Sequence, residues 1–243
     1  MKYDQMATQS QSQVNNDMNI DYFTLAFPIT KWMGFAAGLM PFSSVGYDII
    51  QQQENFTIEY KGEGGVNKAF FGTGATLLEH ISLGVNGVYY FGDVQNKIIT
   101  DFNSDYSTSI LHQSESRNYG GLTYEAGMQG EFSLAGFDFV LGATYSNSQT
   151  ITANQYAEVY QAISINGKSF VDSVNTQLQE ELDVTLPGHL GAGLSVSRNG
   201  LTLTADYTRR LWSEAEVLSG TGNNLVDEDQ ISVGLKFVPD VYS

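Results

Sequence analysis

The sequence contains no cysteine among its 243 residues, which excludes disulfide bonds and thiolate-ligated metal centres. Proline is scarce, at four residues. That scarcity suits long paired strands, because proline cannot donate a hydrogen bond to a strand ladder. Basic residues are few as well: 11 Lys and Arg stand against 27 Asp and Glu, for a formal net charge of -16. Such a balance argues against nucleic acid as a partner, because binding phosphates requires Lys and Arg.

Long hydrophobic runs are also missing. No stretch approaches the roughly 18 apolar residues that a membrane-spanning helix needs, and the mean hydropathy is -0.18. A transmembrane β-barrel is compatible with that value, because half of each strand faces water. The run from Gln5 to Asn16 is polar and resembles no secretory signal peptide. We therefore expect residues 1–17 to be a polar N-terminal segment in loop or disorder, and Met1 to be an internal residue of a longer protein.

Alternation of apolar and small residues is the strongest pattern present. From Leu190 to Val196 every second residue is apolar, and the residues between are Gly or Ser. A period of two predicts a strand. The Asn199-Gly200 pair then predicts a tight hairpin turn, after which the alternation resumes from Leu201 to Tyr207. A hairpin of this kind fits a soluble sandwich with the apolar face inside, or a membrane barrel with that face in lipid.

The same alternation predicts about nine strands in the whole chain. They are expected near residues 18–29, 32–50, 66–76, 80–95, 117–132, 137–148, 186–198, 201–212 and 230–237. Short turns are predicted near residues 30, 78, 135 and 199, and long polar loops at 52–65, 96–116, 153–181 and 215–227. Bacterial outer-membrane barrels sort their connections in this way, with short turns at one end and long loops at the other.

Charged residues recur on the face opposite to the apolar one. Unpaired charges would be costly in a buried core, whereas a water-filled lumen accepts them. These observations predict an all-β, antiparallel transmembrane β-barrel over residues 18–243, with a soluble sandwich or lipocalin-like barrel as the alternative. Single-chain bacterial barrels have an even number of strands, so about nine strands predict a partial barrel. The charged residues concerned are Glu125, Glu131, Asp138, Asp206, Arg210 and Lys236.

Six stretches share their residue pattern and spacing with one family of outer-membrane proteins: Tyr22 to Ile29, Trp32 to Tyr47, Leu83 to Gly92, Leu186 to Ser195, Ala205 to Trp212 and Ile231 to Pro239. They resemble the FadL-like family of outer-membrane transport proteins, the long-chain fatty acid transporter type. The family forms a fourteen-stranded barrel with an N-terminal hatch, so the resemblance implies that this chain carries about nine of a probable fourteen strands. It further implies outer-membrane transport of small hydrophobic compounds such as long-chain fatty acids, by diffusion through the barrel to a lateral exit.

The expected setting is the outer membrane of a Gram-negative bacterium. We expect a monomer in contact with membrane lipid, lipopolysaccharide and a small hydrophobic ligand, with no cofactor, no metal and no nucleic acid. The alternative function is a barrel subunit that anchors or shuttles proteins in a secretion or surface-display system. No enzymatic activity is predicted: His80 and Ser82 share a strand face, but no third group that would orient the histidine accompanies them.

Two groups of site residues follow from this interpretation. Proline within a strand implies a bulge, a kink or an edge, so a lateral gate is predicted at Pro41, Ser43, Ser44 and Gly46, with a simple bulge as the alternative. A second group of polar residues is predicted to contact ligand or to line the lumen, with plain lumen polarity as its alternative. This group is Glu125, Gln129, Glu131, Asp206 and Arg210.

Overall fold

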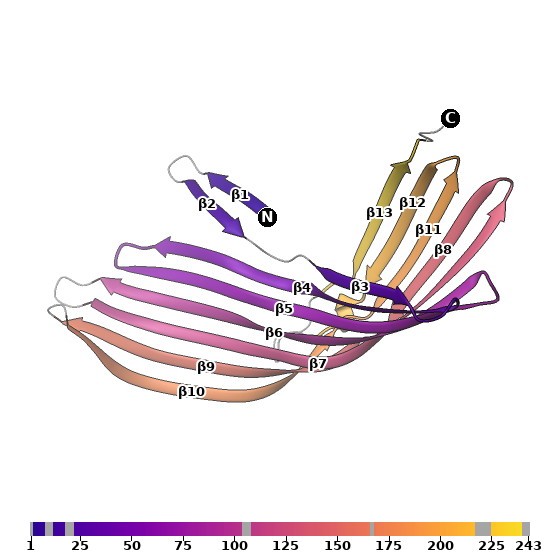
Figure 1. The fold of residues 1–243 in the computed structure, drawn as a ribbon. Helices are drawn as coiled ribbons and strands as arrows, with labels where there is room; N and C mark the ends of the chain where they lie inside the picture. Colours follow the sequence, from indigo (N-terminus) through magenta and orange to yellow (C-terminus); the bar gives the residue numbers. More distant parts are fainter. Residues whose placement is uncertain are drawn as a thin grey trace.

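The computed structural model of the chain is built almost entirely of antiparallel β-strands, curled into an open half-barrel (Figure 1). Within the described residues there is no α-helix; a single 3-10 turn, η1, spans Trp212–Glu214. No helix in these parts is long and apolar enough to cross a membrane. The structure describes residues 2–7, 12–17, 22–103, 108–165, 168–216 and 225–239.

The strands form two sheets. Strands β1 (Lys2–Ala7) and β2 (Ser12–Asp17) pair as a separate hairpin within the predicted polar N-terminal segment. Eleven strands form the main sheet. They are β3 (Phe23–Pro28), β4 (Met33–Gln52), β5 (Phe56–Leu77), β6 (Ile81–Asn103), β7 (Thr108–Leu134), β8 (Phe137–Ser146), β9 (Gln149–Ile165), β10 (Lys168–Leu186), β11 (His189–Arg198), β12 (Leu201–Arg210) and β13 (Glu228–Phe237).

The nine predicted strands all overlap with strands of the main sheet, but the sheet contains two more, β9 and β10. Three of the four predicted long loops are wrong for the same reason. Strands occupy most of residues 52–65, 96–116 and 153–181. They extend the sheet well beyond the end that carries the short turns. Their polar side chains suggested loops, but a strand ladder is held by backbone groups and accepts polar side chains on both faces. Much of the fourth predicted loop, 215–227, lies outside the described residues.

The short turns are found where the sequence predicts them. Left-handed backbone conformations occur at Leu78 and Glu79, at Ala135 and Gly136, and at the Asn199-Gly200 pair. Two successive residues with positive φ characterise the tight turns whose twist matches that of a β-hairpin. A Cβ on Gly200 would lie 2.2 Å from the Val238 carbonyl oxygen, so this position requires glycine.

The main sheet divides along strand β7. Residues Thr108–Gly120 of this strand pair with β9, whereas Ala126–Leu134 pair with β8. Strand β8 pairs onward with β11, so the β9–β10 hairpin is an insertion between these two neighbouring strands. We use the name lower sheet for the part of the main sheet that β3, β8, β11, β12 and β13 form with the ends of β4 to β7 next to the short turns. The two branches separate visibly in Figure 1, where β9 and β10 run one way and β8, β11, β12 and β13 the other.

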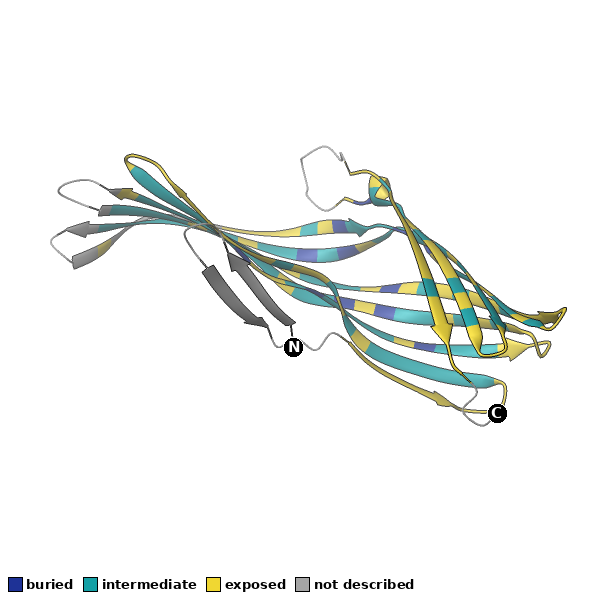
Figure 2. Ribbon diagram, turned by 90° about the horizontal axis from the view of Figure 1, so that it is seen from above, coloured by how far each residue is buried: buried dark blue, intermediate teal, exposed yellow. Residues whose placement is uncertain are grey.

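Few residues are buried, as the scarcity of dark blue in Figure 2 makes plain. The small apolar core lies near the division of the sheet, with Val66, Val88, Tyr90, Ile151, Ala153 and Val184 as its members. Elsewhere large apolar side chains such as Leu83, Leu141 and Leu203 are exposed on one face. Small or polar residues alternate with them in the same strands, and several of these line the hollow face, among them Ser82, Gly84 and Gly142.

Candidate functional site

A cavity of about 580 Å³ lies on the hollow face where the sheet divides. Strands β4 to β8, β11, β12 and β13 all contribute to its lining. It combines aromatic, cationic and anionic side chains: Phe42 meets Tyr90 edge-on with 4.9 Å between ring centroids, and charged groups surround them. The sequence separates these residues widely, and only the division of the sheet brings them to one place.

One of the two ion pairs whose members line this cavity joins β5 to β7. Lys68 Nζ on β5 lies 3.3 Å from Glu125 Oε1 on β7, and 21% of the surface of each side chain is exposed. Glu125 was predicted as a lumen residue, whereas Lys68 was not singled out. The sequence does contain a signal that places Lys68 here. Alternate residues of a strand point to the same face, and Lys68 lies an even number of residues from Gly72 and Gly74, so it shares their face.

A serine and a histidine also meet here. Ser146 Oγ on β8 lies 2.8 Å from His189 Nδ1 on β11, at the first paired position of these two strands. The His80 and Ser82 pair considered from the sequence is not in this cavity. In the described parts of the chain no hydrogen bond holds the other nitrogen of His189, so the third group of a catalytic triad is lacking there. That the protein is not an enzyme stays a prediction.

A network of charges continues the cavity toward the junction of β12 and β13. Arg210 Nη1 donates to Glu228 Oε1 at 3.0 Å, and Trp212 Nε1 donates to Glu228 Oε2 at 3.2 Å. Beside it, the Ser213 hydroxyl and the Arg209 guanidinium donate to Asp227. These hydrogen bonds lower the pKa of Asp227 from 3.8 to about 2, with the Ser213 hydroxyl as the largest cause.

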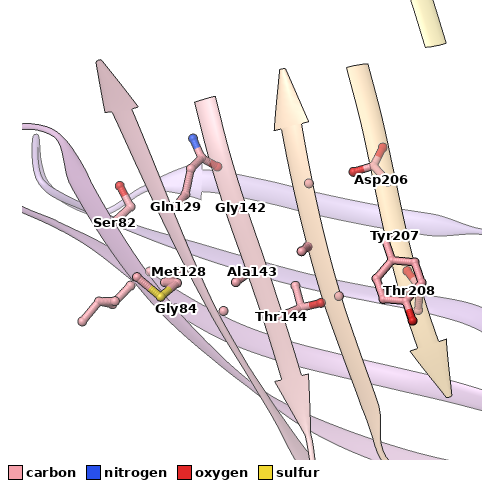
Figure 3. A pocket seen from close by; sticks show the side chains of 16 residues that line it. Ser82, Gly84, Met128, Gln129, Gly142, Ala143, Thr144, Asp206, Tyr207 and Thr208 are labelled. Carbon is pink, nitrogen blue, oxygen red and sulfur yellow. The ribbon is translucent and has the colours of Figure 1, made fainter. Parts of the chain in front are cut away.

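A second hollow of about 420 Å³ lies nearer the short turns, and Figure 3 gives a close view of it. A row of glycines crosses its wall in register from β5 to β7: Gly74 faces Gly84, which faces Gly127. Gln129 and Asp206 rise from this wall.

Four of the five predicted lumen residues fall into two places, and Glu131 lines neither hollow. Glu125 and Arg210 line the cavity at the division, whereas Gln129 and Asp206 line the second hollow. Glu131 accepts a hydrogen bond of 2.9 Å from Gln129 Nε2. Their predicted contact with a ligand stays a prediction.

The predicted gate residues are also divided. Pro41 and Ser43 line the cavity with Phe42 between them, while Ser44 and Gly46 lie further along β4 and line neither hollow. The ladder between β4 and β5 shifts register between Pro41 and Ser43, so a β-bulge is present. The ladder resumes on both sides of the bulge, and a gate at these residues stays a prediction.

Comparison with known proteins changes the assignment made from the sequence. The chain matches no curated protein and no solved structure, but the family model of BamG matches residues 1–243. BamG is a lipoprotein family of the BAM complex, the assembly machinery of the Gram-negative outer membrane.

This match overturns several expectations. The FadL-like resemblance is wrong, because it rested on strand spacing and alternation that unrelated outer-membrane β-proteins share. Fatty acid transport is wrong for the same reason, as is a monomer that binds a small hydrophobic ligand, because the family implies protein partners. The alternative of a subunit in a secretion or surface-display system is closer without being the same. The chain belongs to the BamG family.

Proposed function

We propose that this protein is a component of the BAM complex and takes part in the assembly of outer-membrane proteins. The observation that carries the proposal is the match of the BamG family model to all 243 residues. A scaffold role suits the structure better than a channel role, because β4 to β7, which are 20 to 27 residues long, continue past the division into the long sheet.

The lower sheet is the part proposed to lie in the membrane. Strands β8, β11, β12 and β13 have ten residues each, which matches the roughly 9–11 residues of a transmembrane strand. Their outer face carries exposed Leu141, Leu194 and Leu203, and a bilayer would cover these side chains. Trp32 and Phe132 lie close to the short turns, where aromatic residues contact the membrane interface.

The long sheet beyond the division is proposed to lie in water and to contact other proteins of the complex. The distal parts of β4 to β7, together with β9 and β10, are polar and acidic, and they support charged pairs such as Lys97 with Glu63 at 3.3 Å. A broad polar sheet of this kind offers backbone edges and charged side chains rather than an apolar pocket. Such a surface resembles the polar, water-accessible rim of a protein–protein interface.

The test is isolation of the full-length protein from its native outer membrane through an affinity tag. We expect the other BAM components to co-purify in fixed ratio after mild detergent extraction. Depletion should lower the folded amounts of outer-membrane β-barrel proteins. Purification without any BAM component, together with normal assembly after depletion, would contradict the proposal.

A further inference from the structure

A belt of tyrosines crosses the outer face of the lower sheet, at the end nearer to the long sheet. Its four members stand on β6, β7, β8 and β12, and each is 40% to 51% exposed: Tyr89, Tyr124, Tyr145 and Tyr207. Each lies an even number of residues from an exposed apolar residue of its own strand, such as Leu83, Leu141 or Leu203, so all four share the outer face. Tyrosine is enriched where a membrane meets water.

The tyrosine belt runs obliquely to the strand ladders. Tyr124 pairs with Gly87, which lies two residues nearer to the short turns than Tyr89. Tyr145 in turn pairs with Ala126, two residues nearer to those turns than Tyr124. Strands of a membrane barrel are tilted by roughly 35–45°, so a membrane surface must move along the ladder in one direction from each strand to the next. The tyrosines follow such a line.

Charges begin directly beyond the belt. On β6, Asp93 follows Tyr89 by four residues and is exposed on the same face. At β12 and β13, the Tyr207 hydroxyl donates to Asp229 Oδ1 at 2.5 Å, and Arg209 Nη1 lies 4.0 Å from the same oxygen. Charged side chains are costly in hydrocarbon. The outer face therefore suits lipid up to the tyrosine rings and water beyond their hydroxyl groups.

The hollow face of β6 changes in the opposite sense at nearly the same level. Close to the short turn it carries the polar side chains of Ser82 and Asn86. The next residues on this face are Val88, which is fully buried, and Tyr90, which is 7% exposed, and both belong to the small core. Apolar side chains thus point inward where charges appear outside, as in a sheet that packs one face and exposes the other to water.

Three neighbouring strands have irregular backbones just beyond the belt, where they pass into the long sheet (Figure 1). Strand β4 has its bulge between Pro41 and Ser43, and a bulge bends a strand and increases its twist. On β5 and β6 the backbone has positive φ, at 108° for Gly64 and 150° for Gly92. The ladders bring these features together, because Ser43 pairs with Val66, which pairs with Gly92. We call the bulge and the two glycines the corner.

The corner is tightly packed. A Cβ at Gly64 would clash with the Asp93 carbonyl oxygen, and a Cβ at Gly92 would clash with the Gly65 carbonyl oxygen. Both oxygens belong to strands held in an unbroken ladder. On the hollow side Val66, which is 6% exposed, packs in the core. Only glycine combines these φ angles with this close approach of two backbones.

We propose that the membrane surface lies at the tyrosine belt, and that the corner is a rigid bend at this surface which holds the long sheet in one direction relative to the membrane. The proposal rests on the placement of the lower sheet in the membrane given under the proposed function. The bilayer covers the outer face up to the tyrosine rings, whose hydroxyl groups reach the lipid headgroups. The long sheet then meets its partners in the complex at a fixed height and angle.

Nitroxide labels test the position of the membrane surface. Single cysteines in this cysteine-free chain are placed on the outer face of β6 at Val85, Asp93 or Lys97, and the labelled full-length protein is inserted in vesicles of phosphatidylethanolamine and phosphatidylglycerol. Oxygen concentrates in hydrocarbon, whereas a nickel chelate stays in water. We expect collisions with oxygen to dominate at Val85, and collisions with nickel to dominate at Asp93 and Lys97. Asn86, beside Val85 but on the hollow face, is the control and should lack the preference for oxygen.

The distance between two nitroxides tests the rigid bend. One label is placed at Ser133, next to a short turn, and the other at Gln52, at the far end of β4, and pulsed electron paramagnetic resonance measures their separation. We expect one narrow distance distribution. Gly92→Ala should shift or broaden it, because the added Cβ forces two backbones apart. Gly46→Ala is the matched control and should leave it unchanged, since a Cβ there meets nothing within 4 Å.

The remaining outcomes separate the two proposals. Nickel access at Val85 equal to that at Lys97, or a preference for oxygen at Asp93, would overturn the assigned membrane surface. A broad distribution in the unmodified protein would reveal a hinge and overturn the rigid bend, even where Gly92→Ala fails to insert. An unchanged distribution in inserted Gly92→Ala would do the same. If the other BAM components still co-purify in these cases, the proposed function stands. Loss of co-purification from the unmodified protein would instead remove the proposed function.

Discussion

At the residue scale, Gln149 takes the place of a missing strand. Where β7 passes from β9 to β8, Gln149 Oε1 accepts from the Tyr124 backbone N–H at 3.2 Å, and its Nε2 donates to the Tyr124 carbonyl at 3.1 Å. The side-chain amide thus satisfies the same two groups that a neighbouring strand would satisfy. The division of the sheet costs less free energy for that reason.

We expect Gln149→Ala to lower the free energy of unfolding by about 1 kcal/mol, because two backbone groups lose their partners at a partly water-accessible site. Denaturant unfolding in detergent measures the change. Gln51→Ala serves as the control, since Gln51 is exposed at the end of β4 and no hydrogen bond is described for its side chain. Equal effects of the two changes would contradict the role assigned to Gln149.

The half-shielded pair of Lys68 and Glu125 makes a second residue-scale prediction. The distance from Lys68 Nζ to Glu125 Oε1 is 3.3 Å, and 21% of each side chain is exposed. The burial of this ion pair is therefore intermediate between that of a surface pair and that of a buried pair. A double-mutant cycle with Lys68→Met and Glu125→Gln should give a coupling free energy of about 1 kcal/mol. Lys97 and Glu63, at the same distance but more exposed, are the matched pair and should couple more weakly. A larger coupling in the exposed pair would contradict this reasoning.

Asp227 predicts a dependence of stability on pH. Its pKa is 3.8 in the unfolded reference and about 2 in the folded protein, so the folded state favours the ionised carboxyl. The resulting stabilisation is present above about pH 3.8 and is lost as the pH falls through about 2. Asp227→Asn should remove this part of the acid dependence in unfolding experiments between those values. An acid dependence that Asp227→Asn leaves unchanged would contradict this assignment.

At the scale of single strands, the two faces of β11 and β12 should respond differently to charge. Leu194→Arg and Leu203→Arg put a cation on the face proposed to meet lipid, at a cost of about 2–4 kcal/mol near the middle of a bilayer. Ser195→Arg and Thr204→Arg put it on the hollow face and should cost much less. The yield of membrane-inserted, protease-resistant protein measures the difference. Equal losses on both faces would remove the proposed placement in the membrane.

The β9–β10 hairpin is the element that alternation alone did not reveal. Its residues were predicted as a loop because few apolar side chains mark a period of two there. Backbone pairing, with β7 on one side of β9 and β10 on the other, holds it in place. At its base, the Gly188 N–H donates to Ser148 Oγ at 3.2 Å, and that hydroxyl donates to Glu214 Oε2 at 2.5 Å.

At the scale of the whole molecule, we expect that the inserted β9–β10 hairpin can be deleted without disrupting the strands beside it. Ser146 pairs with His189 across its base, so removal of residues 149–186 would leave a four-residue connection, a common hairpin length. We expect the lower sheet to keep the β8–β11 pairing, tested by a disulfide between cysteines at the paired positions Ala143 and Ala192 in this cysteine-free chain. Co-purification of BAM components should fall, because the polar sheet loses two strands. Failure of the disulfide to form would show that the hairpin is needed for the lower sheet.

The sequence by itself determined the all-β class, part of each of nine strands in the eleven-stranded main sheet, the short turns near 78, 135 and 199, and the alternation of faces. These are local properties: a period of two assigns each side chain to a face, and the Asn199-Gly200 pair accepts the positive φ angles of a tight turn. Polar strands escaped prediction because backbone hydrogen bonds leave no mark in side-chain composition.

Only the tertiary structure decided where the sheet divides and which residues meet there. The cavity brings Lys68 to Glu125 and Ser146 to His189, contacts that depend on pairing between strands far apart in the chain. Register and strand order are set by the sum of all ladders, and a one-residue shift in any of them would send a side chain to the opposite face.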